Sequence, residues 1–265
     1  MYLMKKKLFL IFFFILFFIL FLSSKSYQYI GVDQNIKKIK ITNFQKISAF
    51  YKRHINYNEL VKKIIDNSKN DKKNIIDISS WVYKNIKKIT TDDVTIDKHP
   101  WTIVERKLGA ADQFSDILSV LLVHANIDSF FIMNIDNKIH PFTFFKYQNE
   151  WSIIDPYYGI YFINREASFS TLEEIKNEDL IIQHLIFKEI NKDNLNEIFF
   201  DKKFKNTQEL NDYYKHILRN IPSSNSIDDT NIYERGGRSH IQKPLHRILV
   251  QLKRLLKFNS AELAF

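Results

Sequence analysis

The most apolar part of the chain lies near its N-terminus. Fifteen consecutive apolar residues, Leu8–Leu22, follow the basic stretch MYLMKKK and precede SSKS. A basic region, an apolar region and a boundary of small residues are the layout of an export signal. A helix of this length spans about 22 Å, shorter than the roughly 30 Å core of a bilayer unless flanking residues contribute. Both a cleaved signal and an uncleaved anchor therefore stay open for residues 1–26.

The charges beside this segment indicate where the rest of the chain lies. Lysines precede the apolar run, and the positive-inside rule then places the following residues outside the cytoplasm. We therefore expect an exported protein of the periplasm or cell envelope, held in the inner membrane by residues 8–24.

Apolar residues at intervals of three and four predict amphipathic helices farther along the chain. Two short extended pieces, 27–32 and 36–42, come first. A helix is then expected over 55–68, with Asn56 as its cap. A clearer helix covers 73–89, and its apolar stripe consists of Ile75, Ile78, Val82, Ile86 and Ile89.

A buried helix is expected in the middle of the chain. A short helix over 101–108 is predicted to end at Gly109, because glycine commonly terminates helices. The next helix begins around Asp112, and its wide apolar stripe predicts a place in the core. The stripe consists of Phe114, Ile117, Leu118, Leu121, Leu122 and Ala125.

Three runs rich in aromatic and β-branched residues follow. They cover 128–135, 140–147 and 151–155, with Asn- and Asp-containing turns between them. This pattern predicts an antiparallel meander. Helices followed by such a sheet are typical of an α+β fold, here with one central helix packed on the sheet and extra helices around it.

These patterns divide the chain into six segments. The last is a basic amphipathic helix, which could pack on the domain, lie on a membrane surface or bind a partner helix. The segments are a signal or anchor (1–26), a helical lead-in (27–70), a core (71–165), a helical extension (166–220), a linker (221–243) and the amphipathic helix (244–265).

The composition excludes several classes of protein. The chain has no cysteine, and hence no disulfide, thiolate metal site or thiol catalysis. Its net charge of +9 suits anionic partners such as lipid headgroups or acidic glycans, or simply a solvated lysine-rich surface. The sequence has no zinc finger, phosphate-binding glycine loop or RNA-binding aromatic motif, so we expect no nucleic-acid partner and no cofactor.

Three polar sites stand out against this background. Residues 109–115 begin the central helix, His140 begins a strand, and Asp155 ends the next strand. A thiol at a helix N-terminus has a lowered pKa and is a good nucleophile. A histidine could deprotonate such a thiol, and a carboxylate could orient that histidine.

Together these sites resemble the transglutaminase-like (papain-related) superfamily over residues 75–162. That family has an arginine-containing turn, Gly-x-Cys, a polar pair and a helix, followed by strands that carry His, Trp and Asp. The stretch DPYYGIYF also resembles bacterial envelope members associated with surface polysaccharide. The matching residues here are Arg106, Gly109, Asp112, Gln113, His140, Trp151 and Asp155.

The chain departs from the family at the nucleophile. Ala111 stands where the resemblance implies the catalytic cysteine, and a methyl group cannot attack a carbonyl. His140 and Asp155 are then the remaining dyad. Trp151 and Gln113 are candidates for substrate binding, with the core of the sheet as the alternative for Trp151.

The resemblance therefore implies a pseudoenzyme. We expect a non-catalytic binding or scaffolding module at the cell envelope, with a peptide or glycan as ligand and a link to surface polysaccharide. The alternative is an active envelope amide hydrolase or acyl transferase, through unconventional chemistry or because Ala111 is not the native residue. An accidental resemblance would leave an exported α+β domain.

Other interpretations of these side chains stay open. Ser115 could replace the thiol, but it lies about 6 Å farther along the helix. Asp112 could cap the helix, and Asp155 could simply form a turn. The positions of His140, Asp112 and Asp155 in the sequence do not match a known spacing of metal ligands, so we expect no metal site.

Overall fold

The computed structural model divides into two compact units. The first consists of Met1–Asn56 and Asp92–His99, and the second of Tyr57–Thr91 and Pro100–Phe265. The residues that the structure describes are 2–32, 36–65, 70–89, 95–96, 99–134, 139–177, 181–187, 189–219, 221–224, 227 and 239–241.

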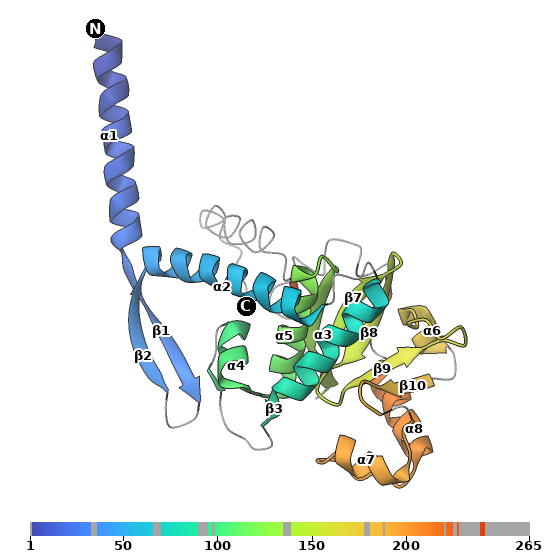
Figure 1. Ribbon diagram of the computed structural model, residues 1–265. Coiled ribbons are helices and arrows are strands. Elements are labelled where there is room, and N and C mark those ends of the chain that lie inside the picture. The colour runs from blue at the N-terminus through green and yellow to red at the C-terminus, as the bar shows by residue number, and fades with distance from the viewer. Residues whose placement is uncertain are drawn as a thin grey trace. The chain divides into compact units, whose positions relative to one another are not determined.

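The first unit contains a long helix and a small sheet. The helix α1 (Tyr2–Ser23) is unbroken (Figure 1), and its large apolar side chains from Phe9 to Phe21 are exposed. Over the described residues, no helix reaches the combined length and hydropathy of a membrane span. The strands β1 (Lys25–Val32) and β2 (Lys37–Thr42) confirm the two predicted extended pieces. They pair antiparallel, and β4 (Thr95–Ile96) extends this sheet beside β1.

The helix α2 (Asn43–Ile64) begins earlier than predicted. The expected cap, Asn56, lies inside this helix, so that prediction is wrong. The actual start is a reciprocal cap between Thr42 and Gln45. The Gln45 Oε1 accepts the Thr42 N–H at 2.8 Å, and the Thr42 Oγ1 accepts the Gln45 N–H at 3.1 Å. Two backbone donors are satisfied in this way, which favours helix initiation at this point.

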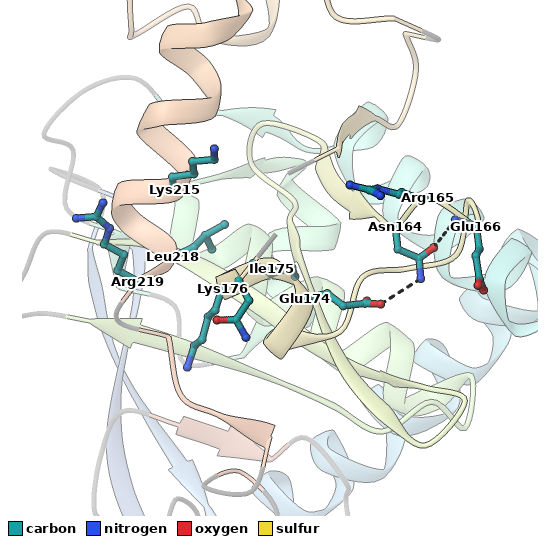
Figure 2. Close-up of a pocket in the computed structure, with 10 residues that line it drawn as sticks. Asn164, Arg165, Glu166, Glu174, Ile175, Lys176, Lys215, Leu218 and Arg219 are labelled. Carbon is teal, nitrogen blue, oxygen red and sulfur yellow. Dashed lines mark hydrogen bonds between the residues drawn. The ribbon is translucent and has the colours of Figure 1, made fainter. Parts of the chain in front are cut away.

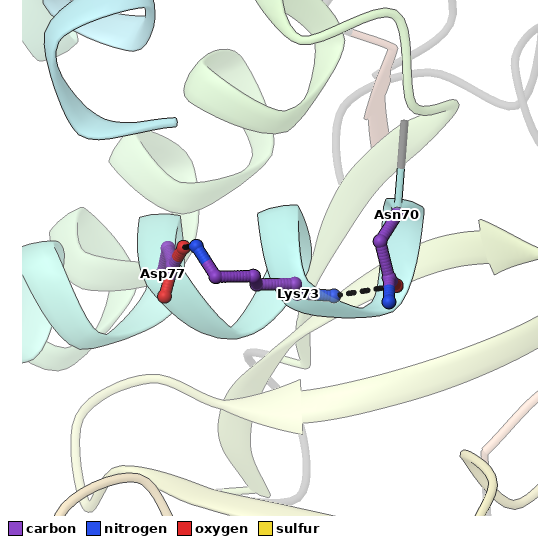
Figure 3. A network of polar contacts seen from close by, with 3 residues as sticks. All are labelled: Asn70, Lys73 and Asp77. Carbon is purple, nitrogen blue, oxygen red and sulfur yellow. Dashed lines mark hydrogen bonds and ion pairs between the residues drawn. The ribbon is translucent and has the colours of Figure 1, made fainter. Parts of the chain in front are cut away.

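In the second unit, α3 (Asp71–Asn85) buries most of the predicted stripe. Ile75, Ile78 and Val82 are fully buried, but the helix ends at Asn85, before the expected residue 89. The Asn70 side chain accepts the Lys73 N–H at 3.1 Å and caps the helix start. Figure 3 shows this cap beside the exposed ion pair between the Lys73 Nζ and Asp77, at 2.8 Å.

The helix α4 (Pro100–Arg106) ends without help from glycine. Lys107 takes the left-handed conformation, with φ of 57°, whereas the predicted terminator Gly109 lies in β5 (Leu108–Gly109). A Cβ at Gly109 would lie 3.2 Å from the Ile103 Cγ2 and 3.3 Å from the Ile86 Cγ2. Glycine at this position therefore permits close packing rather than an unusual φ, which corrects the prediction.

The helix α5 (Ala111–His124) is the buried central helix that the sequence predicts. It packs against β6 (Ser129–Asn134) and β7 (Ile139–Tyr147) of the large sheet (Figure 1). The predicted inward side chains are fully buried from Phe114 to Leu122, and Ala125 is partly buried.

The large sheet is antiparallel throughout, and its strand order is β10-β9-β8-β7-β6-β11. The predicted meander of β6, β7 and β8 (Glu150–Asp155) forms its centre, and β9 (Ile160–Ile163) and β10 (Ile181–His184) extend it. The strand β11 (Ser239–Ile241) pairs with β6. It lies within the segment predicted as a linker, so part of that segment belongs to the sheet. Helices packed on an antiparallel sheet confirm the α+β class.

Three short helices lie between the later strands of the chain, the first between β9 and β10 and the other two between β10 and β11. They are α6 (Leu172–Asn177), α7 (Lys192–Ile198) and α8 (Thr207–Leu218). Each contributes buried apolar side chains to the core of the second unit, so the predicted helical extension is part of that core. The predicted amphipathic helix at 244–265 lies outside the described residues.

Candidate functional site

The start of α5 is held by a side-chain network. Ala111 is the first helical residue, after Ala110 in the cap position. The Gln113 Oε1 accepts the Ala110 N–H at 3.0 Å and an Arg106 Nη2 hydrogen at 2.9 Å. The Arg106 Nε also donates to the Leu108 carbonyl at 2.6 Å. Gln113 is predicted to bind substrate, but its side-chain oxygen is engaged in fixing this turn.

Ser115 and Asp112 have local roles in the same helix. The buried Ser115 hydroxyl donates to the Pro141 carbonyl at 2.8 Å, which ties α5 to β7 and leaves the hydroxyl inaccessible to a substrate. Burial raises the pKa of Asp112, while backbone N–H groups of the first turn lower it. Ala110 holds the cap position and Asp112 is the second residue of the helix, so the expected cap role of Asp112 is wrong.

Asp155 lies at the end of β8 and is fully buried. Its Oδ1 accepts the N–H groups of Tyr157, at 3.1 Å, and Tyr158, at 3.2 Å, so the predicted turn role is confirmed. Its Oδ2 accepts the Tyr214 hydroxyl of α8 at 2.9 Å. The carboxylate thereby joins the central sheet to a helix almost sixty residues away in the sequence.

The other predicted site residues are Trp151 and His140. Trp151 is 4% exposed and packs edge-on against Phe130, with 5.1 Å between ring centres, as a core aromatic would. His140 lies in β7, on the strand next to the one that carries Asp155. Its side chain lies outside the described part, so its pairing with Asp155 and its distance from Ala111 stay predictions.

A lysine that the sequence analysis missed lies on the strand beside the approach to α5. The strand β3 (Lys87–Lys88) runs parallel to β5, and Lys88 pairs with Gly109. Its Nζ lies over four aromatic rings. The distances to the ring centres are 4.8 Å for Tyr83, 5.0 Å for Phe200, 5.2 Å for Tyr157 and 5.7 Å for Tyr158. These rings and the Lys88 ammonium form an aromatic cage, in which cation–π attraction is favourable.

Opposing electrostatic effects act on this cage. Burial lowers the pKa of Lys88 to about 8, and the carboxylates of Asp155 and Asp201 act in the opposite direction. The Tyr158 hydroxyl donates to both oxygens of Asp201 at 2.7 Å. Burial raises the pKa of Tyr83 to about 12, with smaller contributions from nearby carboxylates. The tyrosines are therefore neutral donors at physiological pH.

His184 borders the cage as a neutral side chain. Its Nδ1 accepts the N–H groups of Ile186, at 3.0 Å, and Phe187, at 3.2 Å, which places its proton on Nε2. Burial lowers the pKa of His184 to about 4, the Lys88 charge acts in the same direction, and the Tyr158 backbone opposes both. Its ring meets Tyr83 edge-on, with 5.1 Å between centres.

Gly159 makes the close approach of these two rings feasible. Its φ is +70°, and a Cβ would lie 2.9 Å from the Tyr83 Cδ2 and 3.0 Å from the His184 Nε2. Only glycine suits both the backbone conformation and the space. The stretch DPYYGIYF, noted as a family-like motif, is thus the turn on which this site is built.

The signals for the missed residues were weak or non-local. Lysine runs occur throughout the chain, so Lys88 in KNIKKI has no distinctive local pattern. Tyr214 and His184 reach the site only through the packing of α8 and β10. Among the described residues, no cluster of three or more His, Asp or Glu could hold a metal ion.

Comparisons with known proteins leave the family of the chain open. No protein-family model and no curated protein sequence matches it. Among solved structures, it is similar to a candidate cysteine protease from Cytophaga hutchinsonii, with a TM-score of 0.35 and 14% identity. The match covers 50% of this chain and 64% of that one. A likeness at this level carries no argument about activity.

Proposed function

We propose that this chain is an exported, membrane-anchored domain of the transglutaminase-like (papain-related) type. In this proposal it has lost its nucleophile and serves as a non-catalytic binding or scaffolding module at the cell envelope. The observation that carries the proposal is the position of Ala111 as the first residue of α5. In the family pattern the thiol would stand there, where the free N–H groups of a helix start could bind an oxyanion.

The residues that match the family pattern support a framework without a nucleophile. Arg106 and Gln113 hold the turn before the helix, and Asp155 is buried at the end of β8. Ser115, the nearest hydroxyl-bearing residue of α5, donates to the Pro141 carbonyl instead. Acyl transfer needs a nucleophile that a general base can activate, and alanine offers none.

The N-terminal helix supports the anchoring part of the proposal. α1 exposes consecutive large apolar side chains, which are costly in water and stable in lipid. The basic residues before it favour an orientation with the remaining chain outside the cytoplasm. A peptide or a glycan held near the start of α5 is the ligand class that this proposal implies.

The decisive experiment restores the thiol in the full chain. Because the protein has no other cysteine, Ala111→Cys creates a single thiol whose alkylation by iodoacetamide can be followed by mass. We expect alkylation at pH 7 at least about tenfold faster than for Ala125→Cys at the opposite end of α5, because the helix start lowers a thiol pKa. The rate should fall when His140→Ala is added.

Two results would contradict the proposal. Equal rates at positions 111 and 125 would show that the helix start does not activate a thiol. A fast thiol indifferent to His140→Ala would remove the histidine from the site and, with it, the family assignment. Intrinsic fluorescence of each variant before labelling controls for misfolding.

A further inference from the structure

A basic groove lies beside β9, and none of its lining residues belongs to α5. Its volume is about 680 Å³, and its walls come from the loop after β9, from α6 and from the C-terminal end of α8. Figure 2 shows basic side chains on each of these three segments. The basic lining residues are Arg165, Lys176, Lys215 and Arg219.

The loop that carries Arg165 has a defined shape. The Asn164 Oδ1 accepts the N–H groups of Glu166, at 3.1 Å, and Ser168, at 3.0 Å. The Asn164 Nδ2 donates to a Glu174 oxygen at 3.4 Å, which links the loop to α6. These bonds fix the backbone on both sides of Arg165, so its guanidinium projects from an ordered wall.

The floor of the groove is anchored in the core. Ile175 of α6 and Leu218 of α8 line it and are 4% and 1% exposed. Because both are buried, α6 and α8 are held together in the core, and the exposed basic side chains next to these residues, Lys176 and Arg219, come from α6 and from the C-cap of α8. The groove is therefore part of the packed fold.

The charges of the lining are unbalanced. Two acidic side chains oppose the four basic ones, and one of them, Glu174, also accepts the Thr171 N–H at 2.7 Å. Among the described residues, no ion pair involves Arg165, Lys176 or Arg219. Cations in the last turn of a helix also stabilise that helix, which accounts in part for Lys176 and Lys215. Arg165 lies on a loop and has no such role.

We propose that this groove binds an acidic carbohydrate chain through its carboxylate groups. Guanidinium groups bind carboxylates in a bidentate geometry. The exposed amide of Asn177 offers a donor and an acceptor for sugar hydroxyls. A concave site with cations on separate walls suits a chain that enters it better than a flat membrane surface. The scarcity of apolar lining disfavours a peptide, since peptide sites usually hold apolar anchors.

The inference stands apart from the proposed function, because it uses no residue of the α5 start. It is tested with the full chain in a neutral detergent, by the binding of a galacturonic acid decamer in isothermal titration. A neutral galactose decamer serves as the ligand control. We expect Arg165→Glu/Arg219→Glu to weaken binding of the acidic decamer at least about tenfold. The milder Arg165→Gln/Arg219→Gln should weaken it to a smaller extent.

The matched control reverses the charge of two lysines that precede the N-terminal end of α8. Lys203 and Lys205 are exposed and absent from the groove lining, so Lys203→Glu/Lys205→Glu changes the net charge equally. An equal loss in this control would overturn the proposal in favour of non-specific attraction. Equal binding of the neutral decamer would exclude the carboxylate role. Binding of anionic vesicles that depends on Arg165 and Arg219, without binding of the decamer, would assign the groove to lipid headgroups instead.

Discussion

Lys88 pairs with Gly109 across the parallel strands β3 and β5, two residues before α5 begins at Ala111. An amine in an aromatic cage therefore lies on the strand that borders the helix start. Tyr157 contacts both the aromatic cage and α5. The centre of its ring lies 5.2 Å from the Lys88 Nζ and 5.3 Å from the centre of the Phe114 ring.

The first prediction concerns the pH dependence of stability. Burial lowers the pKa of Lys88 from 10.5 to about 8 in the fold, so between these values the unfolded chain binds more protons than the folded chain. The contribution of Lys88 to the free energy of unfolding therefore rises as the pH increases from 8 to 10. Urea denaturation at several pH values should show this rise in the wild type and not in Lys88→Met. Parallel profiles would mean that the aromatic rings hold the pKa near its ordinary value.

The second prediction concerns the bond between Tyr214 and Asp155. Tyr214→Phe removes the donor to a buried carboxylate. It should lower the free energy of unfolding by about 1.5–3 kcal/mol, as expected for a hydrogen bond to a charged group. Tyr213→Phe is the matched control, since no hydrogen bond of its hydroxyl is found among the described residues, and its effect should stay within about 0.5 kcal/mol. Equal effects of the two substitutions would show that Asp155 does not depend on this donor.

The third prediction compares two glycines. Gly159→Ala introduces a Cβ at φ of +70° and 2.9 Å from the Tyr83 ring. We expect a loss of at least about 1–3 kcal/mol in thermal or urea unfolding. Gly109→Ala meets contacts of 3.2 Å at ordinary φ, so its cost should be smaller. The reverse order would contradict the described turn.

The fourth prediction concerns the start of α3. Asn70→Ala removes the side chain that accepts the Lys73 N–H, and should cost about 1 kcal/mol of unfolding free energy. Asp77→Ala removes only the exposed ion pair with the Lys73 Nζ, and should cost less than about 0.5 kcal/mol. A larger effect at Asp77 would mean that the ion pair, and not the cap, holds this helix end.

The fifth prediction tests the proposed anchor. Leu16 lies in the middle of the apolar run, so Leu16→Arg should release the chain from membranes washed with alkaline carbonate, because a charge is costly in the hydrocarbon core. Ser23→Arg, at the end of α1, should leave the chain in the membrane pellet. Release of the wild type under the same conditions would contradict anchoring by α1.

The periodic placement of apolar residues predicts those helices and strands whose burial depends on their own sequence alone. The apolar stripe of α5 and the runs of aromatic and β-branched residues in β6 to β8 are buried, so these patterns directly report burial. Local patterns misplace the start of α2, because Thr42 and Gln45 form the cap that Asn56 was expected to provide. The prediction that Gly109 ends α4 fails for another reason. Gly109 permits close packing against neighbouring side chains, and Lys107 takes the left-handed conformation that ends the helix.

The candidate site is less accessible to such reasoning. Asp155 is recognisable from its position before Pro156, whereas its partner Tyr214 lies in a helix that follows several intervening elements. The cage around Lys88 joins rings from α3, the β8–β9 turn and the segment after α7. No short stretch of sequence contains enough of these residues to reveal the cluster.

The hydrogen bond from Tyr214 to Asp155 also constrains how this protein can change over evolutionary time. Loss of the Tyr214 donor would leave one oxygen of a buried carboxylate without this hydrogen bond, so we expect Asp155 and Tyr214 to be retained together. A descendant that keeps α8 but replaces Tyr214 by an apolar residue should carry an uncharged residue at the end of β8. Related sequences can therefore be checked for the joint presence of these two residues.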